Sequence, residues 1–234
     1  SDAVDTALRF VQYRNNVLGR PKKKKILCRE KGYHGSSYLA ATVSGTGREH
    51  DRTFMDTHHD LAVMLPNINP YLRSKNVSKD EWCDQKIKEM EETILSVGAD
   101  QIGCFIAEPI LASGGVIVPP AGYHARSLEL CKKYDIVYIS DETVTGFGRL
   151  GHWFASKEVF NIQPDIITCA KGLTSGYLPM GAAIISDSLI DGIKNTEGSQ
   201  PFTNGYTYSC HPVAAKAALT NICLLYTSDA ADEV

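Results

Sequence analysis

The residues of this chain that could do chemistry stand where apolar runs end. Glu108 closes one such run, Asp141 and Glu142 close a second, and Lys171 closes a third, "DIITCAK". Singly, each of these side chains would be interpreted as a turn residue that reaches water. If the three runs are neighbouring parallel strands, however, two or three of these acids and the lysine share one edge of a sheet, a composition typical of a reaction site.

Lys171 has the most specific chemistry of this set. A lysine in a partly dry pocket has a depressed pKa and attacks carbonyl groups to form a Schiff base, the resting linkage of pyridoxal phosphate in enzymes. That cofactor needs an acid at its pyridine nitrogen, an aromatic or apolar side chain against its ring, and donors for its phosphate. The chain offers Asp141 as the acid, Tyr33 of "GYHGSS" as the stacking ring and Thr207 of "GYTYSCHP" as a phosphate hydroxyl. The sequence therefore favours a pyridoxal-phosphate site.

A competing motif, "GFGRLG" at residues 146–151, fits the G-x-G-x-x-G pattern and would indicate a dinucleotide-dependent oxidoreductase. Asp141 and Glu142 lie just before these glycines, where carboxylates would repel a pyrophosphate. No clear helix begins inside the motif, and no acid follows about 20 residues later at the end of a second strand, where a ribose partner is expected. The oxidoreductase is therefore the weaker interpretation.

The elements that must position these side chains alternate between strands and helices. Continuous apolar runs predict strands that are mostly buried on both faces, at residues 24–30, 101–110, 135–142, 165–171 and 181–186. Helical periodicity occupies residues 3–11, 78–97 and 119–134, and the second of these opens with a Ser78/Glu81 capping box. This alternation predicts an α/β fold with a mainly parallel sheet covered by helices on both faces.

Six motifs, in this order, resemble the class III (omega) aminotransferases, a family of fold type I pyridoxal-phosphate enzymes. They are "SDAVDTA", "GYHGS", "AEPI...GGVIVPP", "SDETVTGFGR", "PDIITCAKGLTSGYLPMGA" and "FTNGYTYSCHP", and the resemblance covers residues 1–222. It implies the large domain of that fold, with a mixed, mostly parallel sheet in which residues 181–186 form the antiparallel strand. The glycines of "GFGRLG" then belong to a structural turn of the family.

The resemblance also implies roles for the residues around the cofactor ring. Lys171 would carry the cofactor as a Schiff base and move the proton between the substrate and cofactor carbons, and Asp141 would pair with the pyridine nitrogen. Tyr33 would stack on the ring. Thr143 stands where the family usually has a valine under the ring, so its methyl group can pack there and its hydroxyl can alter ring electronics or substrate orientation. Glu108 would sit just behind the reacting groups or gate the substrate.

Two residues would hold the phosphate, and they imply the assembly. Ser1, at a helix N-terminus, would bind the phosphate in its own subunit, and Thr207 would reach the phosphate of a partner's cofactor. The implied unit is a homodimer with its active site at the interface. Its activity would be transamination of an omega-amino acid or amine with a keto acid, pyruvate in the subgroup that the chain most resembles. A mutase or lyase of the same family, or a catalytically inactive truncated domain, are the alternatives.

The ends of the chain depart from the family. The "SG" expected before Ser1 and the small C-terminal domain are absent, so residues 1–222 are interpreted as a cofactor-binding large domain that is incomplete at both ends. Residues 223–234 are unlike the family and resemble a translated sequencing adapter. We therefore expect the helix that starts near Pro212 to lose its packing beyond Ile222, and we expect a large exposed apolar surface.

Composition sets the remaining limits. A formal charge of -3 gives no footprint for nucleic acid or an anionic membrane. No apolar run reaches the roughly 18 residues of a membrane span, and the N-terminus is unlike a signal peptide, so a cytoplasmic or organelle-matrix protein that is not secreted is expected. The seven scattered cysteines predict buried free thiols. His50, His58 and His59 lack the spacing of metal ligands, so no metal site is predicted.

Overall fold

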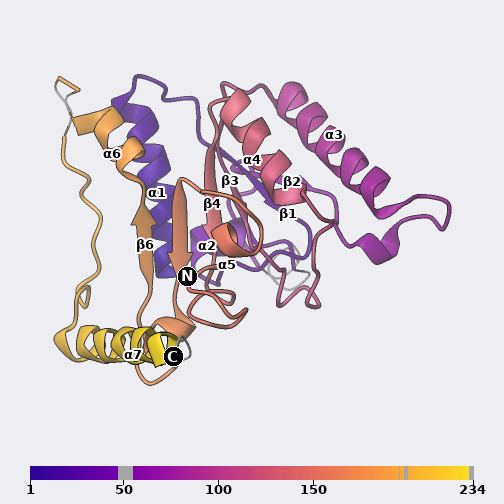
Figure 1. Cartoon of the computed structure of the whole chain (residues 1–234). Helices are drawn as coiled ribbons and strands as arrows, with labels where there is room; N and C mark the ends of the chain where they lie inside the picture. Colours follow the sequence, from indigo (N-terminus) through magenta and orange to yellow (C-terminus); the bar gives the residue numbers. More distant parts are fainter. Residues whose placement is uncertain (47–54, 195, 198–199, 232–234) are drawn as a thin grey trace.

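The computed structural model of the protein describes residues 1–46, 55–194, 196–197 and 200–231 (Figure 1). Its helices and strands, in chain order, are α1 (Asp2–Val17), β1 (Lys25–Arg29), α2 (Tyr38–Thr42), β2 (Ala62–Leu65), η1 (Pro70–Leu72), α3 (Lys79–Val97), β3 (Ile102–Ala107), α4 (Tyr123–Lys133), β4 (Val137–Asp141), α5 (Ala155–Glu158), β5 (Ile166–Cys169), η2 (Lys171–Thr174), β6 (Ala182–Ile185), α6 (Asp187–Lys194) and α7 (Pro212–Ala231).

A six-stranded sheet runs through the described structure in the order β2-β1-β3-β4-β5-β6. The first five strands of this order pair in parallel, and β6 pairs antiparallel with β5, with Ile166 opposite Ile185. The expected mixed, mostly parallel sheet, with residues 181–186 supplying the antiparallel strand, is confirmed. The edge strand β2 is an addition to the expected strands, because its apolar run directly follows a polar, histidine-containing stretch that ends at Asp60.

Helices cover both faces of this sheet (Figure 1). Neighbouring residues of one strand enter different core clusters: Leu27 and Phe105 pack with α3 and α4, whereas Ile26 and Cys104 pack with α1 and α6. Neither face of the central strands meets water, which explains why their sequences are continuously apolar.

Local sequence signals fix where the main helices begin. Ser78 Oγ accepts a hydrogen bond from Glu81 N (3.1 Å) and Glu81 Oε2 accepts one from Ser78 N (2.8 Å), which completes the expected capping box of α3. Helix α4 starts at Tyr123, after the predicted start near Pro120, because Gly122 precedes it in a left-handed conformation with φ 76°. These signals fix the first residues of α3 and α4, Lys79 and Tyr123.

The segment after β4 forms turns throughout residues 143–151. Gly148 and Gly151 adopt φ values of 85° and 80°, which favour glycine. Within the described residues 146–151 no helix begins, and the next one, α5, starts at Ala155. The motif "GFGRLG" is therefore a structural turn and not a helix N-terminus that would bind a nucleotide.

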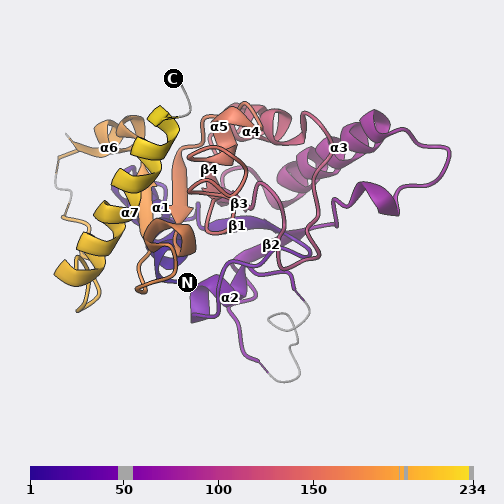
Figure 2. The same cartoon turned by 60° about the horizontal axis from the view of Figure 1, so that its bottom comes forward.

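Helix α7 runs on past Ile222 to Ala231 (Figure 2). Leu224 and Tyr226 are 61% and 68% exposed, as expected for a segment without packing, whereas Leu225 is partly buried. The segment stays helical because each further residue adds a hydrogen bond to an existing helix. Its interpretation as a non-native tail stays a prediction, and its last residues, 232–234, lie outside the described residues.

All seven cysteines are free. Five of them are buried, as predicted, and Cys210 and Cys223 are exposed. In the part of the chain that the structure describes, no helix is both long and apolar enough to cross a membrane.

Candidate active site

The carboxyl ends of β3, β4 and β5 open onto a cavity of about 230 Å³ at one edge of the sheet. The residues that line it are Ser1, Tyr33, His34, Gly35, Glu108, Ser113, Asp141, Thr143, Val144, Ala170 and Lys171. All but one of the residues expected at a cofactor site are in this set. They come from the start of α1, the loop after β1 and the ends of three strands, which the fold brings to one place.

A larger cavity, of about 600 Å³, lies elsewhere and is lined by Gly148, by parts of residues 151–167 and by Leu225. None of the expected site residues lines it, so cavity size and chemistry point to different places. We place the candidate site at the smaller cavity, because the ionisable groups at the strand ends converge there.

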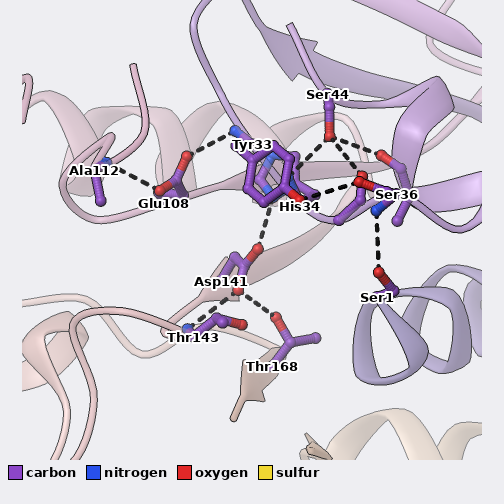
Figure 3. A network of polar contacts seen from close by, with 12 residues as sticks. Ser1, Tyr33, His34, Ser36, Ser44, Glu108, Ala112, Asp141, Thr143 and Thr168 are labelled. Atoms are coloured by element: carbon purple, nitrogen blue, oxygen red, sulfur yellow. Dashed lines mark hydrogen bonds and ion pairs between the residues drawn. The ribbon is translucent and has the colours of Figure 1, made fainter. Parts of the chain in front are cut away.

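Asp141 ends β4, and its side chain is 2% exposed. Its Oδ2 lies 2.7 Å from His34 Nδ1, and its Oδ1 accepts hydrogen bonds from Thr168 Oγ1 (3.0 Å) and Thr143 N (3.2 Å) (Figure 3). Burial alone would raise the pKa of this carboxyl, but the hydrogen bond and charge of His34, together with Thr143, outweigh it and hold the pKa below its usual value. The cavity wall therefore carries a carboxylate at neutral pH.

His34 is a site residue that the sequence interpretation missed. Its side chain is 1% exposed, its backbone N donates to Ser44 Oγ (2.9 Å), and its Nδ1 is the partner of Asp141. With Asp141 ionised, Nδ1–H is the donor, which fixes the ring and the carboxylate relative to each other. The signal was present in "GYHGSS", next to Tyr33, but the pairing joins residues 107 positions apart and needs the fold to become visible.

Glu108 follows β3 and is 5% exposed. Its Oε1 accepts a hydrogen bond from Tyr33 N (2.8 Å), and its Oε2 accepts one from Ala112 N (3.1 Å). Burial raises the pKa of Glu108, and His34 and the two N–H groups offset only part of that rise. Both carboxylate oxygens are thus engaged by backbone groups of two different loops at the cavity wall.

The N-terminus of α1 forms one end of the cavity. Ser1, at the N-cap position, accepts a hydrogen bond at Oγ from Ser36 N (3.0 Å). Gly35 has φ 128°, and a Cβ at this position would lie 2.7 Å from Ser1 Cα, so only glycine lets the loop approach the helix this closely. Helix N-termini favour anions because their N–H groups point outward and lack partners. Ser1 and Ser36 are therefore suited to hold a phosphate.

Tyr33 and Thr143 are both half-buried residues of the cavity wall. The Tyr33 hydroxyl lies 3.1 Å from Ser36 Oγ, so the ring is held at its tip as well as through the backbone bond to Glu108. Thr143 is fixed through its backbone N, which donates to Asp141. A flat aromatic cofactor ring in this cavity could pack against the ring of Tyr33 and the methyl group of Thr143.

Lys171 follows β5 and opens η2 with φ 39°, an unusual value for a residue other than glycine. It lines the cavity together with Asp141, yet it is exposed. The prediction that Lys171 lies in a partly desolvated pocket is therefore wrong for a single copy of the described chain, because the other cavity residues do not cover the lysine side chain.

Of the two or three acids expected at this edge of the sheet, the structure places Glu108 and Asp141 on the cavity but not Glu142. Glu142 is fully buried and accepts hydrogen bonds from Thr145 Oγ1, Ala155 N (3.1 Å), Ser156 N (2.7 Å) and Ser156 Oγ (2.5 Å). Successive residues of a strand point to opposite sides, so Asp141 and Glu142 cannot face one cavity together. Glu142 instead ties the turn after β4 to the start of α5.

Thr207 is exposed in a turn before α7 and does not line the cavity with the other site residues. His58 and His59 lie in a polar loop, where His59 Nδ1 is 2.9 Å from Thr57 Oγ1, and His50 lies outside the described residues. Among the described residues no group of histidine, cysteine and acid side chains could hold a metal ion.

The chemistry of these walls fits pyridoxal phosphate. Asp141 supplies the negative charge that a protonated ring nitrogen needs, and its low pKa keeps that charge in place. The close approach of Gly35 to Ser1 brings the Ser1 hydroxyl and Ser36 together at a helix N-terminus, where polar groups can meet a phosphate. Lys171, on the same cavity, supplies the amine that would hold the cofactor covalently.

Comparison with known proteins agrees with this geometry. The family model described as aminotransferase class-III matches residues 1–234. The gamma aminobutyrate transaminase 1, mitochondrial, of Solanum lycopersicum is 41% identical over 225 residues, which cover 95% of this chain and 43% of that protein. The vanillin aminotransferase of Capsicum frutescens is 41% identical over 222 residues, which cover 94% of this chain and 48% of that protein.

Solved structures agree as well. An amine transaminase from an uncultivated Pseudomonas species, in its PLP-bound form, superposes with a TM-score of 0.91 at 36% identity, over 97% of this chain and 51% of that one. A transaminase from directed evolution by ancestral reconstruction gives a TM-score of 0.92 at 40% identity, over 98% of this chain and 50% of that one. The chain spans about half the length of the relatives it matches. It belongs to the class III aminotransferase family, whose cofactor is pyridoxal phosphate.

Proposed function

We propose that the protein catalyses pyridoxal-phosphate-dependent transamination between an amine or omega-amino acid and a keto acid, with pyruvate as the acceptor. The observation that carries the proposal is the convergence of Asp141 and Lys171 on one cavity with a phosphate-suited helix N-terminus at its end. The relatives named gamma aminobutyrate transaminase and vanillin aminotransferase support transfer of an amino group to or from a small organic compound.

The residues divide the work according to their contacts. When bound, pyridoxal phosphate supplies a protonated ring that draws electrons away from the substrate carbon. Asp141 would keep the ring nitrogen of the bound cofactor protonated, and His34 keeps Asp141 oriented and ionised through the 2.7 Å contact at Nδ1. Lys171 Nζ would hold the cofactor covalently and would accept and return the proton at the substrate carbon. Ser1 would bind the phosphate, and Tyr33 and Thr143 would contact the ring.

We propose that the functional unit is a homodimer in which Thr207 of one copy completes the phosphate site of the other. Three observations support it: Thr207 is exposed away from its own cavity, Lys171 is open to water, and large apolar side chains beside both residues are exposed. Tyr177, Tyr208 and Val213 are 85%, 80% and 59% exposed. Exposed aromatic residues of this kind are typical of protein interfaces.

We also propose a cytoplasmic or organelle-matrix location. The tomato relatives named mitochondrial and chloroplastic support it. Fractionation of source cells with immunoblotting tests it, and recovery from the secreted fraction would contradict it.

The decisive experiment removes the amine of Lys171 from the full-length protein. Borohydride reduction of the wild-type protein loaded with pyridoxal phosphate should leave the label on the peptide that contains Lys171, and mass spectrometry identifies that peptide. Lys171→Ala should lose the covalent label and at least about 10³-fold in transamination rate, because nucleophile and base vanish together. Lys194→Ala, which changes an exposed lysine paired with Asp191, is the matched control and should behave as wild type. Near-normal turnover in Lys171→Ala would sink the proposal.

A further inference from the structure

We propose that Glu108 is a positioning residue that clasps the loop Leu111–Ile117 against the segment Lys31–Tyr33, and that this clasp sets the width of the substrate end of the cavity between Tyr33 and Ser113. The inference rests on the proposed function, since it assigns a specificity-determining wall to the same site. It adds Ser113, a cavity residue absent from the sequence expectations, and gives Glu108 a task that does not require contact with substrate.

The first half of the clasp is electrostatic. A single carboxylate, 5% exposed, accepts a backbone N–H from each of two segments that lie far apart in the sequence: Tyr33 N at Oε1 and Ala112 N at Oε2 (Figure 3). Hydrogen bonds to an ionised acceptor are shorter and stronger than neutral ones. The two bonds therefore fix the distance between the two segments.

The second half is steric and involves different atoms. Gly114 packs directly against the backbone of Lys31: a Cβ on Gly114 would overlap Lys31 O and lie 2.8 Å from Lys31 Cβ. Lys31 itself adopts φ 69°, and Val116 adopts φ 54°, a strained value for a β-branched residue. Such conformations persist only where the surroundings hold them. The contact between the loop and the segment is thus close and specific.

The loop that carries these contacts is closed at its base. Leu111 and Ile117 exchange two backbone hydrogen bonds of 3.1 Å, so the intervening residues move as one unit. Ser113 lies between Ala112, which is bound to Glu108, and Gly114, which is packed on Lys31. Its position is therefore fixed from both sides, and it is the loop residue that reaches the cavity.

The location of the clasp identifies the end of the cavity that it controls. Figure 3 shows Glu108 and Ala112 on the opposite side of Tyr33 from Ser1. Ser113 of the clasped loop lines the cavity together with Lys171, whose amine would hold the cofactor at its reacting carbon, so the loop forms part of the wall that a bound substrate would meet. A wall fixed in this way selects amines by the size of the group that lies against Ser113. The kcat/KM of an amine should change by about 10-fold or more for each carbon added to that group.

The first test needs neither cofactor nor turnover. Amide hydrogen exchange in the cofactor-free full-length protein should show Tyr33 and Ala112 protected in the wild type. In Glu108→Ala both amides should exchange about tenfold faster or more, because each loses a charged acceptor. In Glu108→Gln, which keeps the shape but can accept at only one of the two positions, one of the two amides should remain protected. Unchanged exchange at both amides in Glu108→Ala overturns the clasp.

The second test moves the wall and leaves the carboxylate in place. In Gly114→Ala the added Cβ must push the loop away from Lys31, so the kcat/KM ratio of a bulky to a small amine should change by about tenfold or more while cofactor affinity stays unchanged. Gly192→Ala, at a position where a Cβ meets no atom within 4 Å, should leave the ratio as in the wild type. An equal loss for every amine in Gly114→Ala overturns the proposal. Absence of turnover with all amines in the wild type would instead refute the proposed function, and the exchange test would still decide on the clasp.

Discussion

Replacement of Glu142 should lower the free energy of unfolding and leave the transamination activity of the folded protein unchanged. The Glu142 carboxylate has no exposed surface and accepts hydrogen bonds from Thr145, Ala155 and two groups of Ser156. Each hydrogen bond to a charged group contributes about 1.5–3 kcal/mol, but bonds in one network do not add. Removal of the carboxylate leaves the buried donors of Thr145, Ala155 and Ser156 without an acceptor, at about 1–3 kcal/mol for each unsatisfied group, and we expect Glu142→Ala to lose about 3 kcal/mol or more of the free energy of unfolding.

Urea unfolding followed by far-UV circular dichroism measures this loss. Glu142→Gln should lie between wild type and Glu142→Ala, because the amide oxygen still accepts while the amide NH₂ faces donors. Glu158→Ala is the matched control, since it removes an exposed glutamate from the neighbouring helix and should change stability by no more than about 0.5 kcal/mol.

The refuting result is equally definite. If Glu142→Gln kept wild-type stability and lost transamination in the folded fraction, Glu142 would be a catalytic acid of the site, as its place beside Asp141 in the sequence first indicates. Retained activity per folded molecule with a lowered unfolding free energy supports its role as the anchor between the turn after β4 and α5.

Two further predictions concern the ionised site and the assembly. The pKa of Asp141 lies below its ordinary value of 3.8, so its stabilising contribution is present above that pH and is lost as pH falls through the folded-state pKa. His34→Ala removes the largest contributions that oppose burial and leaves those of Thr143, so the pKa of Asp141 should rise. The stability difference from wild type, measured by urea unfolding, should be largest above pH 3.8 and should shrink on acidification, and a pH-independent difference would contradict this. For the proposed homodimer, sedimentation equilibrium should give twice the subunit mass. Mixing inactive Lys171→Ala subunits with weakly cofactor-binding Thr207→Ala subunits should restore turnover, because a hybrid dimer contains one site with both native residues; mixtures no more active than their parts would count against a shared site.

Much of the fold follows from the sequence because its signals are local. Continuous apolar runs bounded by polar residues predicted five strands, and the Ser78/Glu81 pair predicted the start of α3 at the observed residue. The edge strand β2 was not predicted, because its apolar run directly follows a polar stretch that ends at Asp60. The start of α4 shifted because a single left-handed glycine, Gly122, ended the preceding loop later than Pro120 indicated.

The sequence predicts a site residue where the strand topology alone brings it to the site. It does not do so where membership depends on the direction of the side chain. Residues at the ends of parallel strands must meet at one edge, so Asp141 and Lys171 could be placed together from sequence. Whether Asp141 or Glu142 faces the cavity depends on the pleat of β4. An apolar run that is buried on both faces does not indicate which of its residues point to which side of the sheet. The partner of Asp141, His34, lies on a loop far away in sequence and becomes a candidate only when the loop is folded.

The exposure of Lys171 is the most informative disagreement between sequence and structure. The chemistry of an amine nucleophile requires a partly dry environment, and a single copy of the chain does not provide one, since Lys171 is open to water while Asp141 beneath it is buried. Thr207, the hydroxyl expected at the phosphate, is absent from the same cavity. One arrangement accounts for both departures: a second subunit that covers the lysine would carry its own Thr207 segment with it. Tyr177 and Tyr208, which follow Lys171 and Thr207 in the sequence, are 85% and 80% exposed and are suited to such a contact. On this reasoning the dryness of Lys171 is a property of the proposed dimer, so a variant that stays monomeric should bind pyridoxal phosphate weakly even with every residue of its own cavity intact.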